Sequence, residues 1–287
     1  MRSWLFAPGD SEKKMAKAAD SPADIVLLDL EDSVMPEGKP AARAQVSAFL
    51  TSRSDRQRIW VRINPMQSGE IEKDLAAIMA TAPGGVMLPK AEGREDVEAL
   101  DAILSEHEAQ HGIAQGSTLV AALVTETAAA MFTTGSYCGA PRLAAMTWGA
   151  EDLGAAIGAR IQHRPDGQYM PVFELARTLC LLGAAAAGVA PIETIMPDFR
   201  DLEGLAARAR MVRSQGFRGM LAIHPDQIAT INAAFTPGEE EIAHARRVIA
   251  AFSVNPGQGA ARLDGSMVDI PHLKLAKALL ADAGLDE

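Results

Sequence analysis

The chain has 287 residues, of which 48% are hydrophobic and 22% are charged, and its formal net charge is −10. This length suffices for one α/β barrel with a large buried core, and so acidic a chain has no general attraction for nucleic acid or for anionic membranes. Its two cysteines, Cys138 and Cys180, have neither the spacing of a metal site nor the number of a disulfide framework, so we expect reduced thiols.

Short apolar runs alternate with helical patterns along most of the chain. Each run is apolar on both faces, which is typical of a strand buried between a barrel core and an outer helix. Eight is the number of strands that closes a TIM barrel, so the pattern predicts a (β/α)8 barrel. An open doubly wound sheet is the alternative, although no glycine-rich dinucleotide motif favours it. The predicted strands are 4–7, 25–28, 59–63, 86–88, 119–124, 143–147, 192–196 and 220–223. The predicted helices include 11–19, 39–50, 71–79, 94–111, 173–187 and 202–215.

A C-terminal appendage remains after the eighth predicted strand. Residues 237–253 have the pattern of a helix with proline at its start, and a second helix is predicted to begin at Pro271. Gly257 and Gly259, which lie between the two helices, indicate a hinge. We interpret the appendage as a brace or a lid on the barrel. The chain is thus predicted to form two parts, a catalytic barrel over 1–236 and a helical extension over 237–287.

Polar residues follow seven of the eight predicted strands, at the ends where barrel enzymes carry their chemistry. Each one alone could be a structural ion pair or a helix cap, and Asp152, for example, could cap a helix that starts at Leu153. Together they indicate an active site, because burying unpaired charge is costly. Carboxylates from neighbouring strands suit Mg²⁺, whereas no pair of histidines or cysteines is placed for zinc. The residues concerned are Asp29, Glu31, Asp32, Arg62, Asn64, Lys90, Glu126, Glu151, Asp152, Asp198 and His224.

Two lysines share one face of the first predicted helix. Lys13 and Lys17 are four residues apart, and the helix follows a turn at Pro8 and Gly9 beside the rim of the barrel. A cationic face at this place suits the phosphates of a ligand. The alternative is a solvated helix face, which is what most runs of lysine are.

Motifs along the whole chain carry a family resemblance, and they occur in the order that the family shows. They are RSWLFAPG (2–9), LLDLEDSV (27–34), VRIN (61–64), LPKAE (88–92), VTET (124–127), WGAEDL (148–153), AIHPDQI (222–228) and DGSMVDIP (264–271). With these motifs the chain resembles the citrate lyase β-subunit-like family of CoA-thioester lyases. Relatives in that family include malyl-CoA lyases, citramalyl-CoA lyases and malyl-CoA thioesterases.

The resemblance implies a TIM barrel with a magnesium site. Glu126 of the VTET segment and Asp152 of the GAEDL segment are implied to hold Mg²⁺, with Glu126 also near the substrate. Arg62 of the VRIN segment is implied to bind the oxygens of the substrate and to take part in catalysis. We expect Glu31 and Asp32 to order the water molecules around Mg²⁺.

The resemblance also assigns residues to coenzyme A and to proton transfer. Phe6, Lys13 and Lys17 match positions that contact CoA in CoA-dependent members, although some members have tyrosine in place of Phe6. Asp269 of the MVDIP segment matches a residue that acts as acid or base in some relatives and reaches the site from a neighbouring subunit. The extension is therefore expected to pack on a neighbouring subunit of a homo-oligomer, a trimer or a hexamer.

The implied reaction is Mg²⁺-dependent cleavage of a 3-hydroxy-carboxyacyl thioester, of the citryl-, malyl- or citramalyl-CoA type, to an acyl thioester and a small 2-oxo acid. The thioester is carried by CoA or by an acyl carrier protein. The alternatives are a malyl-CoA-type thioesterase, a 2-keto acid aldolase that needs no thioester, and a catalytically silent subunit of a lyase complex. The sequence shows neither a signal-peptide pattern nor an apolar run of the roughly 20 residues that span a membrane, so we expect a cytoplasmic enzyme without nucleic-acid or membrane partners.

Overall fold

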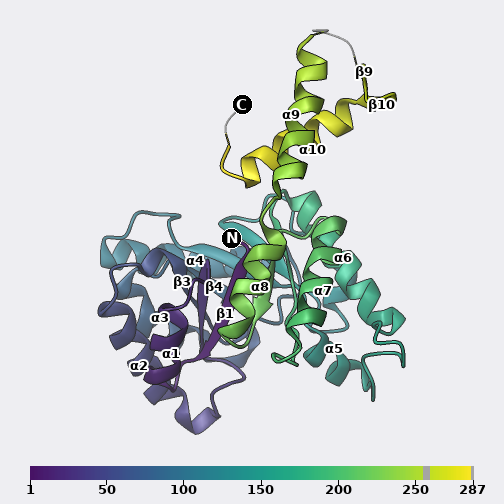
Figure 1. The fold of residues 1–287 in the computed structure, drawn as a ribbon. Coiled ribbons are helices and arrows are strands. Elements are labelled where there is room, and N and C mark those ends of the chain that lie inside the picture. Colours follow the sequence, from purple (N-terminus) through teal and green to yellow (C-terminus); the bar gives the residue numbers. More distant parts are fainter. Residues whose placement is uncertain (255–258, 286–287) are drawn as a thin grey trace. The chain divides into compact units, whose positions relative to one another are not determined.

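The computed structural model describes residues 1–254 and 259–285, and Figure 1 shows its ribbon. The chain divides into two compact units, Met1–Asn232 and Ala233–Glu287. Gly257, which the sequence places in a hinge, lies outside the described residues. Within the described ranges, no helix has both the length and the apolar character needed to cross a membrane.

The first unit is a closed barrel of eight parallel strands, which confirms the predicted (β/α)8 fold. Each strand pairs with the next one along the chain, and the first strand closes the ring against the eighth, with Trp4 opposite Leu221. The seventh strand, predicted over 192–196, begins and ends earlier, so that Glu193 is its last residue. The strands are β1 (Ser3–Pro8), β2 (Ile25–Asp29), β3 (Ile59–Arg62), β4 (Gly85–Leu88), β5 (Leu119–Leu123), β6 (Leu143–Thr147), β7 (Ala190–Glu193) and β8 (Gly219–Ala222).

The strands are apolar throughout because both of their faces are covered. Alternate residues such as Ile25 and Leu27 face the barrel interior, where they belong to one cluster with Trp4 and Trp60. The two indole rings meet edge to face, with centroids 5.1 Å apart. The intervening residues, such as Val26, are also fully buried, because the outer helices cover that side of the sheet.

Helices surround the barrel in Figure 1, and the predicted ones are confirmed with small shifts at their ends. A short helix follows β6, near the place where a helix starting at Leu153 was considered. It begins at Ala150 with Gly149 as its N-cap, so Asp152 lies in its first turn and does not cap a helix starting at Leu153. The helices are α1 (Glu12–Ala19), α2 (Lys39–Thr51), α3 (Ile71–Ile78), α4 (Arg94–His111), α5 (Ala150–Ile157), α6 (Pro171–Ala187), α7 (Leu202–Gln215) and α8 (Asp226–Phe235).

The second unit contains two helices and a hairpin. The helices α9 (Glu239–Ser253) and α10 (Ile270–Asp282) correspond to the two predicted from the sequence, whereas the antiparallel pair β9 (Ala260–Leu263) and β10 (Ser266–Asp269) was not predicted. Asp264 and Gly265 form its two-residue turn, and both have positive φ, at 50° and 82°, as a tight hairpin turn requires. Val268 packs with α9 and α10 in a small core of this unit.

Candidate functional site

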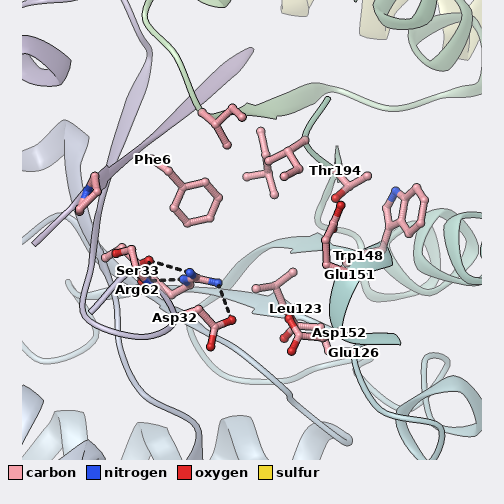
Figure 2. A pocket seen from close by; sticks show the side chains of 16 residues that line it. Phe6, Asp32, Ser33, Arg62, Leu123, Glu126, Trp148, Glu151, Asp152 and Thr194 are labelled. Carbon is pink, nitrogen blue, oxygen red and sulfur yellow. Dashed lines mark hydrogen bonds and ion pairs between the residues drawn. The ribbon is translucent and has the colours of Figure 1, made fainter. Parts of the chain in front are cut away.

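A cavity of about 380 Å³ opens at the carboxyl ends of the barrel strands. Figure 2 shows its lining, in which apolar side chains lie beside charged ones: Leu123 is next to Glu126 and Asp152, and Phe6 is next to Arg62. The lining residues come from several barrel strands, from the loops that follow them and from the first turn of α5. The polar lining residues are Asp29, Asp32, Ser33, Arg62, Glu126, Glu151, Asp152 and Thr194.

Arg62 is held in the cavity by two acidic residues and one aromatic ring. It is the last residue of β3 and lies opposite Asp29 in the barrel register, so the two side chains point the same way. Its Nε and Nη2 donate to Asp29 Oδ1 and Oδ2 at 2.8 and 2.7 Å. Its Nη1 lies 2.8 Å from Glu31 Oε2, and the guanidinium stacks on Phe6, 4.9 Å from the ring centroid. The guanidinium group of Arg62 is therefore fixed in orientation before any ligand binds.

Asp29 was named in the sequence only as a residue near the rim, and its role comes from the fold. It is 3% exposed, and its oxygens also accept the backbone N–H groups of Glu31 and Ser33 at 2.9 and 3.2 Å. Burial raises the pKa of Asp29, but the charge and the hydrogen bonds of Arg62 lower it more, so the pKa lies below its ordinary value. Asp29 is therefore a charged anchor for Arg62.

Glu126 and Asp152 stand next to each other at the cavity wall (Figure 2). Glu126 follows β5 and is 3% exposed, whereas the side chain of Asp152, in the first turn of α5, is 30% exposed. Burial, and after it the neighbouring charges of Asp152 and Glu31, raise the pKa of Glu126 to about 8, although the N–H of Lys90 and the charge of Arg62 oppose the rise. A cation between these carboxylates would relieve both effects.

This carboxylate pair fits Mg²⁺ and does not fit a closed metal site. Across the part of the chain that the structure describes, no cluster of three or more histidine, cysteine, aspartate or glutamate side chains has the geometry of a metal site. Mg²⁺ uses one or two protein carboxylates and fills its other positions with water and ligand oxygens. Glu126 and Asp152 offer such oxygens beside an open cavity.

Lys90 is the second residue near the rim whose role the sequence left open. Its ammonium pairs with the buried Glu31 and lies 3.3 Å from Asp152 Oδ1 and 3.7 Å from Asp32 Oδ2. Burial lowers the pKa of Lys90, but Glu31 and the other acidic neighbours raise it well above its ordinary value, so the side chain stays charged. Glu31 and Asp32 therefore already have cationic partners at the cavity.

A buried polar network supports the far wall of the cavity. Glu193, at the end of β7, is fully buried and accepts from Arg208 Nη2 at 2.5 Å and from Trp148 Nε1 at 3.2 Å. Arg208 also donates to the hydroxyl of Tyr169 at 2.8 Å. Glu193 was not predicted as a functional residue, because it lies inside the run 192–196 that was predicted as a buried strand. The network fixes Trp148, which lines the cavity.

Several residues singled out in the sequence are not among those that line the cavity. Lys13 and Lys17 are exposed on α1, which follows the end of β1, and they are absent from the cavity lining. Asp269 belongs to the second unit, where it is the N-cap of α10 and its Oδ1 lies 2.5 Å from His272 Nδ1. His224 stacks on Phe199, with centroids 4.4 Å apart.

Comparisons with known proteins agree with the motifs. A family model described as HpcH/HpaI aldolase/citrate lyase matches residues 2–225. A citrate lyase subunit beta-like protein of Mycobacterium tuberculosis is 38% identical over 281 residues, covering 98% of this chain and 95% of that protein. A (3S)-malyl-CoA thioesterase of Cereibacter sphaeroides is 35% identical, covering 98% and 94%, and a mitochondrial citramalyl-CoA lyase of Rattus norvegicus is 33% identical, covering 97% and 85%.

Solved structures also place the chain near members of this family. The crystal structure of CitE from Mycobacterium tuberculosis in complex with magnesium, acetoacetate and coenzyme A superposes with a TM-score of 0.82 at 37% identity, covering 99% of this chain and 98% of that one. The family predicted from the motifs, and the prediction of an enzyme among lyases, are thereby confirmed. This chain belongs to the HpcH/HpaI aldolase/citrate lyase family.

Proposed function

We propose that this chain is a Mg²⁺-dependent carbon–carbon lyase. Its substrate is a 3-hydroxy-carboxyacyl thioester of the citryl-, malyl- or citramalyl-CoA type, and its products are an acyl thioester and a 2-oxo acid. The observation that carries the proposal is the open carboxylate pair of Glu126 and Asp152, which shares one cavity with the fixed cation of Arg62. The relatives that are named lyases, and the related structure with magnesium and coenzyme A, support it.

Glu126 and Asp152 are the residues that would hold the metal. When bound there, Mg²⁺ supplies Lewis acidity to oxygens of the substrate. Arg62 stabilises the negative charge that develops on a substrate oxygen as the carbon–carbon bond breaks, and its pairing with Asp29 keeps it in place without reorganisation. The backbone N–H groups at the start of α5, which follow Gly149, suit the carboxylate of the 2-oxo acid.

Asp269 is proposed as the base that removes a proton from the α-carbon in the direction of synthesis. In cleavage it gives a proton to the departing α-carbon after it has received the one that the hydroxyl group of the substrate releases. Its hydrogen bond with His272 lowers its pKa, so it is charged at neutral pH. In this proposal the residue serves the site of a neighbouring copy, and the 237–287 extension packs on that copy in a homo-oligomer, a trimer or a hexamer. The alternative is that Asp269 only caps α10, a position that it occupies in its own chain.

The thioester handle is proposed to lie over Phe6 and along α1. The exposed ammonium groups of Lys13 and Lys17 are available for the phosphates of CoA, or for the phosphopantetheine of an acyl carrier protein. The proposed lyase reaction uses small acidic metabolites, and we propose that the enzyme acts in the cytoplasm. Relatives named thioesterases leave hydrolysis of a malyl-CoA-type substrate as the second candidate function, because the same metal and arginine would serve it.

The deciding experiment is incubation with a panel of CoA thioesters and Mg²⁺, followed by mass detection of the products. A lyase gives an acyl-CoA and a 2-oxo acid, and a thioesterase gives free CoA and a hydroxy acid. Glu126→Gln and Asp152→Asn should abolish both Mg²⁺ binding and activity with an unchanged fold, whereas Glu98→Gln, at an exposed ion pair on α4, should change neither. Full activity of the unaltered enzyme in EDTA would rule out the metal.

A further inference from the structure

Lys90 contacts both residues that we propose as metal ligands, and the inference drawn from it rests on that proposed function. Its backbone N–H donates to Glu126 Oε2 at 2.6 Å, and its ammonium lies 3.3 Å from Asp152 Oδ1. The ammonium also pairs with Glu31, whose side chain is 4% exposed. One lysine thus touches the carboxylates at the place where the metal would bind.

The backbone of Lys90 lies in the left-handed region, with φ of 52°. This conformation is costly for a residue with a Cβ atom, and glycine would adopt it without that cost. Strained backbone that persists beside a site is commonly part of its function. The N–H group alone could be supplied by glycine, so the presence of lysine indicates that the ammonium itself has a role.

Arg62, which lines the cavity, and Lys90, which contacts the proposed metal ligands, differ in how their charge is balanced. Arg62 is paired in bidentate fashion with Asp29, which is not one of the proposed metal ligands. Lys90 pairs with Glu31, which it shares with Arg62, and it also lies within 4 Å of Asp32 and of Asp152, one of the proposed metal ligands. A divalent cation placed between Glu126 and Asp152 would therefore be close to the ammonium and would be repelled by it.

We propose that Lys90 is a built-in counter-cation of the metal site. It neutralises the carboxylates while no metal is bound, and it weakens the binding of Mg²⁺ alone. The negative charge of a 2-oxo acid offsets the repulsion, so metal and substrate bind tightly only together. By linkage, the acid must strengthen metal binding by the same factor by which the metal strengthens binding of the acid. Lys90 acts here as a positioning residue for the metal and the acid.

Titration calorimetry with Mg²⁺, in the absence and in the presence of pyruvate as the 2-oxo acid, tests the proposal. Lys90→Met should bind Mg²⁺ alone at least about tenfold more tightly than the unaltered protein, since even water-like screening leaves a repulsion of that size a few ångströms from a divalent ion. Pyruvate should strengthen Mg²⁺ binding of the unaltered protein by a much larger factor than that of the variant. Lys73→Met, which removes an exposed pair with Glu70 outside the cavity, should match the unaltered protein in both titrations.

Thermal melting, first without metal and then with Mg²⁺, gives a second readout. In EDTA, Lys90→Met should melt at a lower temperature than the unaltered protein, because its carboxylates have lost their counter-charge, and Mg²⁺ should raise its melting temperature by the larger amount. Lys90→Gly keeps the N–H contact with Glu126, suits the left-handed backbone and should show the same tighter binding. If folded Lys90 variants show an unchanged Mg²⁺ affinity and an unchanged effect of pyruvate, the proposed role of Lys90 as a counter-cation is wrong. Failure of the unaltered protein to bind Mg²⁺ at all would instead overturn the proposed function, and the counter-cation with it.

Discussion

Asp29→Asn tests how far the site depends on one carboxylate that no ligand needs to touch. The change keeps the size of the side chain and removes its charge. Four donors point at the two oxygens of Asp29: Nε and Nη2 of Arg62, and the N–H groups of Glu31 and Ser33. An amide offers one oxygen, so its NH2 group would face two donors and accept from neither.

The size of the loss follows from burial. Asp29 is 3% exposed, and removing one partner of a buried ion pair costs about 3–5 kcal/mol. Because Arg62 keeps Glu31 at 2.8 Å, we expect the lower end, about 3 kcal/mol. Domains unfold at about 5–15 kcal/mol, so the variant should remain folded. An arginine displaced by about 1 Å can reduce catalysis about 100-fold, and we expect kcat/KM to fall by that order.

Urea unfolding of both proteins at several pH values measures the effect. The folded pKa of Asp29 is below its unfolded value, so the carboxylate contributes its full stability above about pH 4 and loses it as the pH falls through the folded pKa. The difference between the proteins should therefore be largest at neutral pH and shrink in acid. A difference below about 1 kcal/mol at neutral pH, the size of a surface ion pair, would refute the reasoning.

Three further changes test other parts of the molecule. Replacing Lys13 and Lys17 together by alanine should raise KM for a CoA thioester about tenfold with little change in kcat, as expected for two exposed phosphate contacts. An unchanged KM would mean that the two lysines only form a solvated helix face. Glu108, on α4, is fully buried and accepts from Arg142 Nη1 at 2.6 Å and from the backbone N–H groups of Gly116 and Thr118. Although burial raises the pKa of Glu108, these partners lower it from 4.5 to about 2, so Glu108→Gln should lose about 3 kcal/mol of stability at neutral pH, and this loss should disappear as the pH falls through that range. Chemical denaturation at neutral and acid pH measures the loss, and an equal loss at both would contradict the assignment. Mixing inactive Asp269→Asn with inactive Arg62→Ala under subunit exchange should restore up to about a quarter of the activity, because about one site in four then combines both intact residues; verified mixed oligomers without rescue would remove Asp269 from the neighbour's site.

The barrel could be predicted from the sequence because its physical cause is local. A strand covered on both faces needs an uninterrupted apolar run, and each such run is visible without knowing its partners. Glu193 shows where that reasoning ends. An acidic residue in an apolar run has no local sign of its role, since its partners Arg208 and Trp148 are supplied by other elements of the barrel.

The candidate site was predicted in outline for a similar reason. The rule that barrel chemistry gathers at the strand ends brought Arg62, Glu126 and Asp152 to one rim, and the structure places all three around the cavity. Which charges pair depends on strand register, and only the fold shows that Asp29 lies opposite Arg62. The left-handed backbone of Lys90 also left no trace in the sequence, because that conformation is ordinarily read from glycine or asparagine.

The placement of the three tryptophans gives the protein two separate optical signals. Trp148 lines the cavity and donates to Glu193, so its emission should respond when a ligand changes the polarity or the hydrogen bonding at that wall. Trp4 and Trp60 meet edge to face inside the barrel, and coupled indoles in a fixed chiral arrangement give a near-ultraviolet dichroic signal. The change in fluorescence when a ligand is added therefore reports occupancy of the cavity, and the near-ultraviolet dichroism of the indole pair reports the packing of Trp4 against Trp60 in the core.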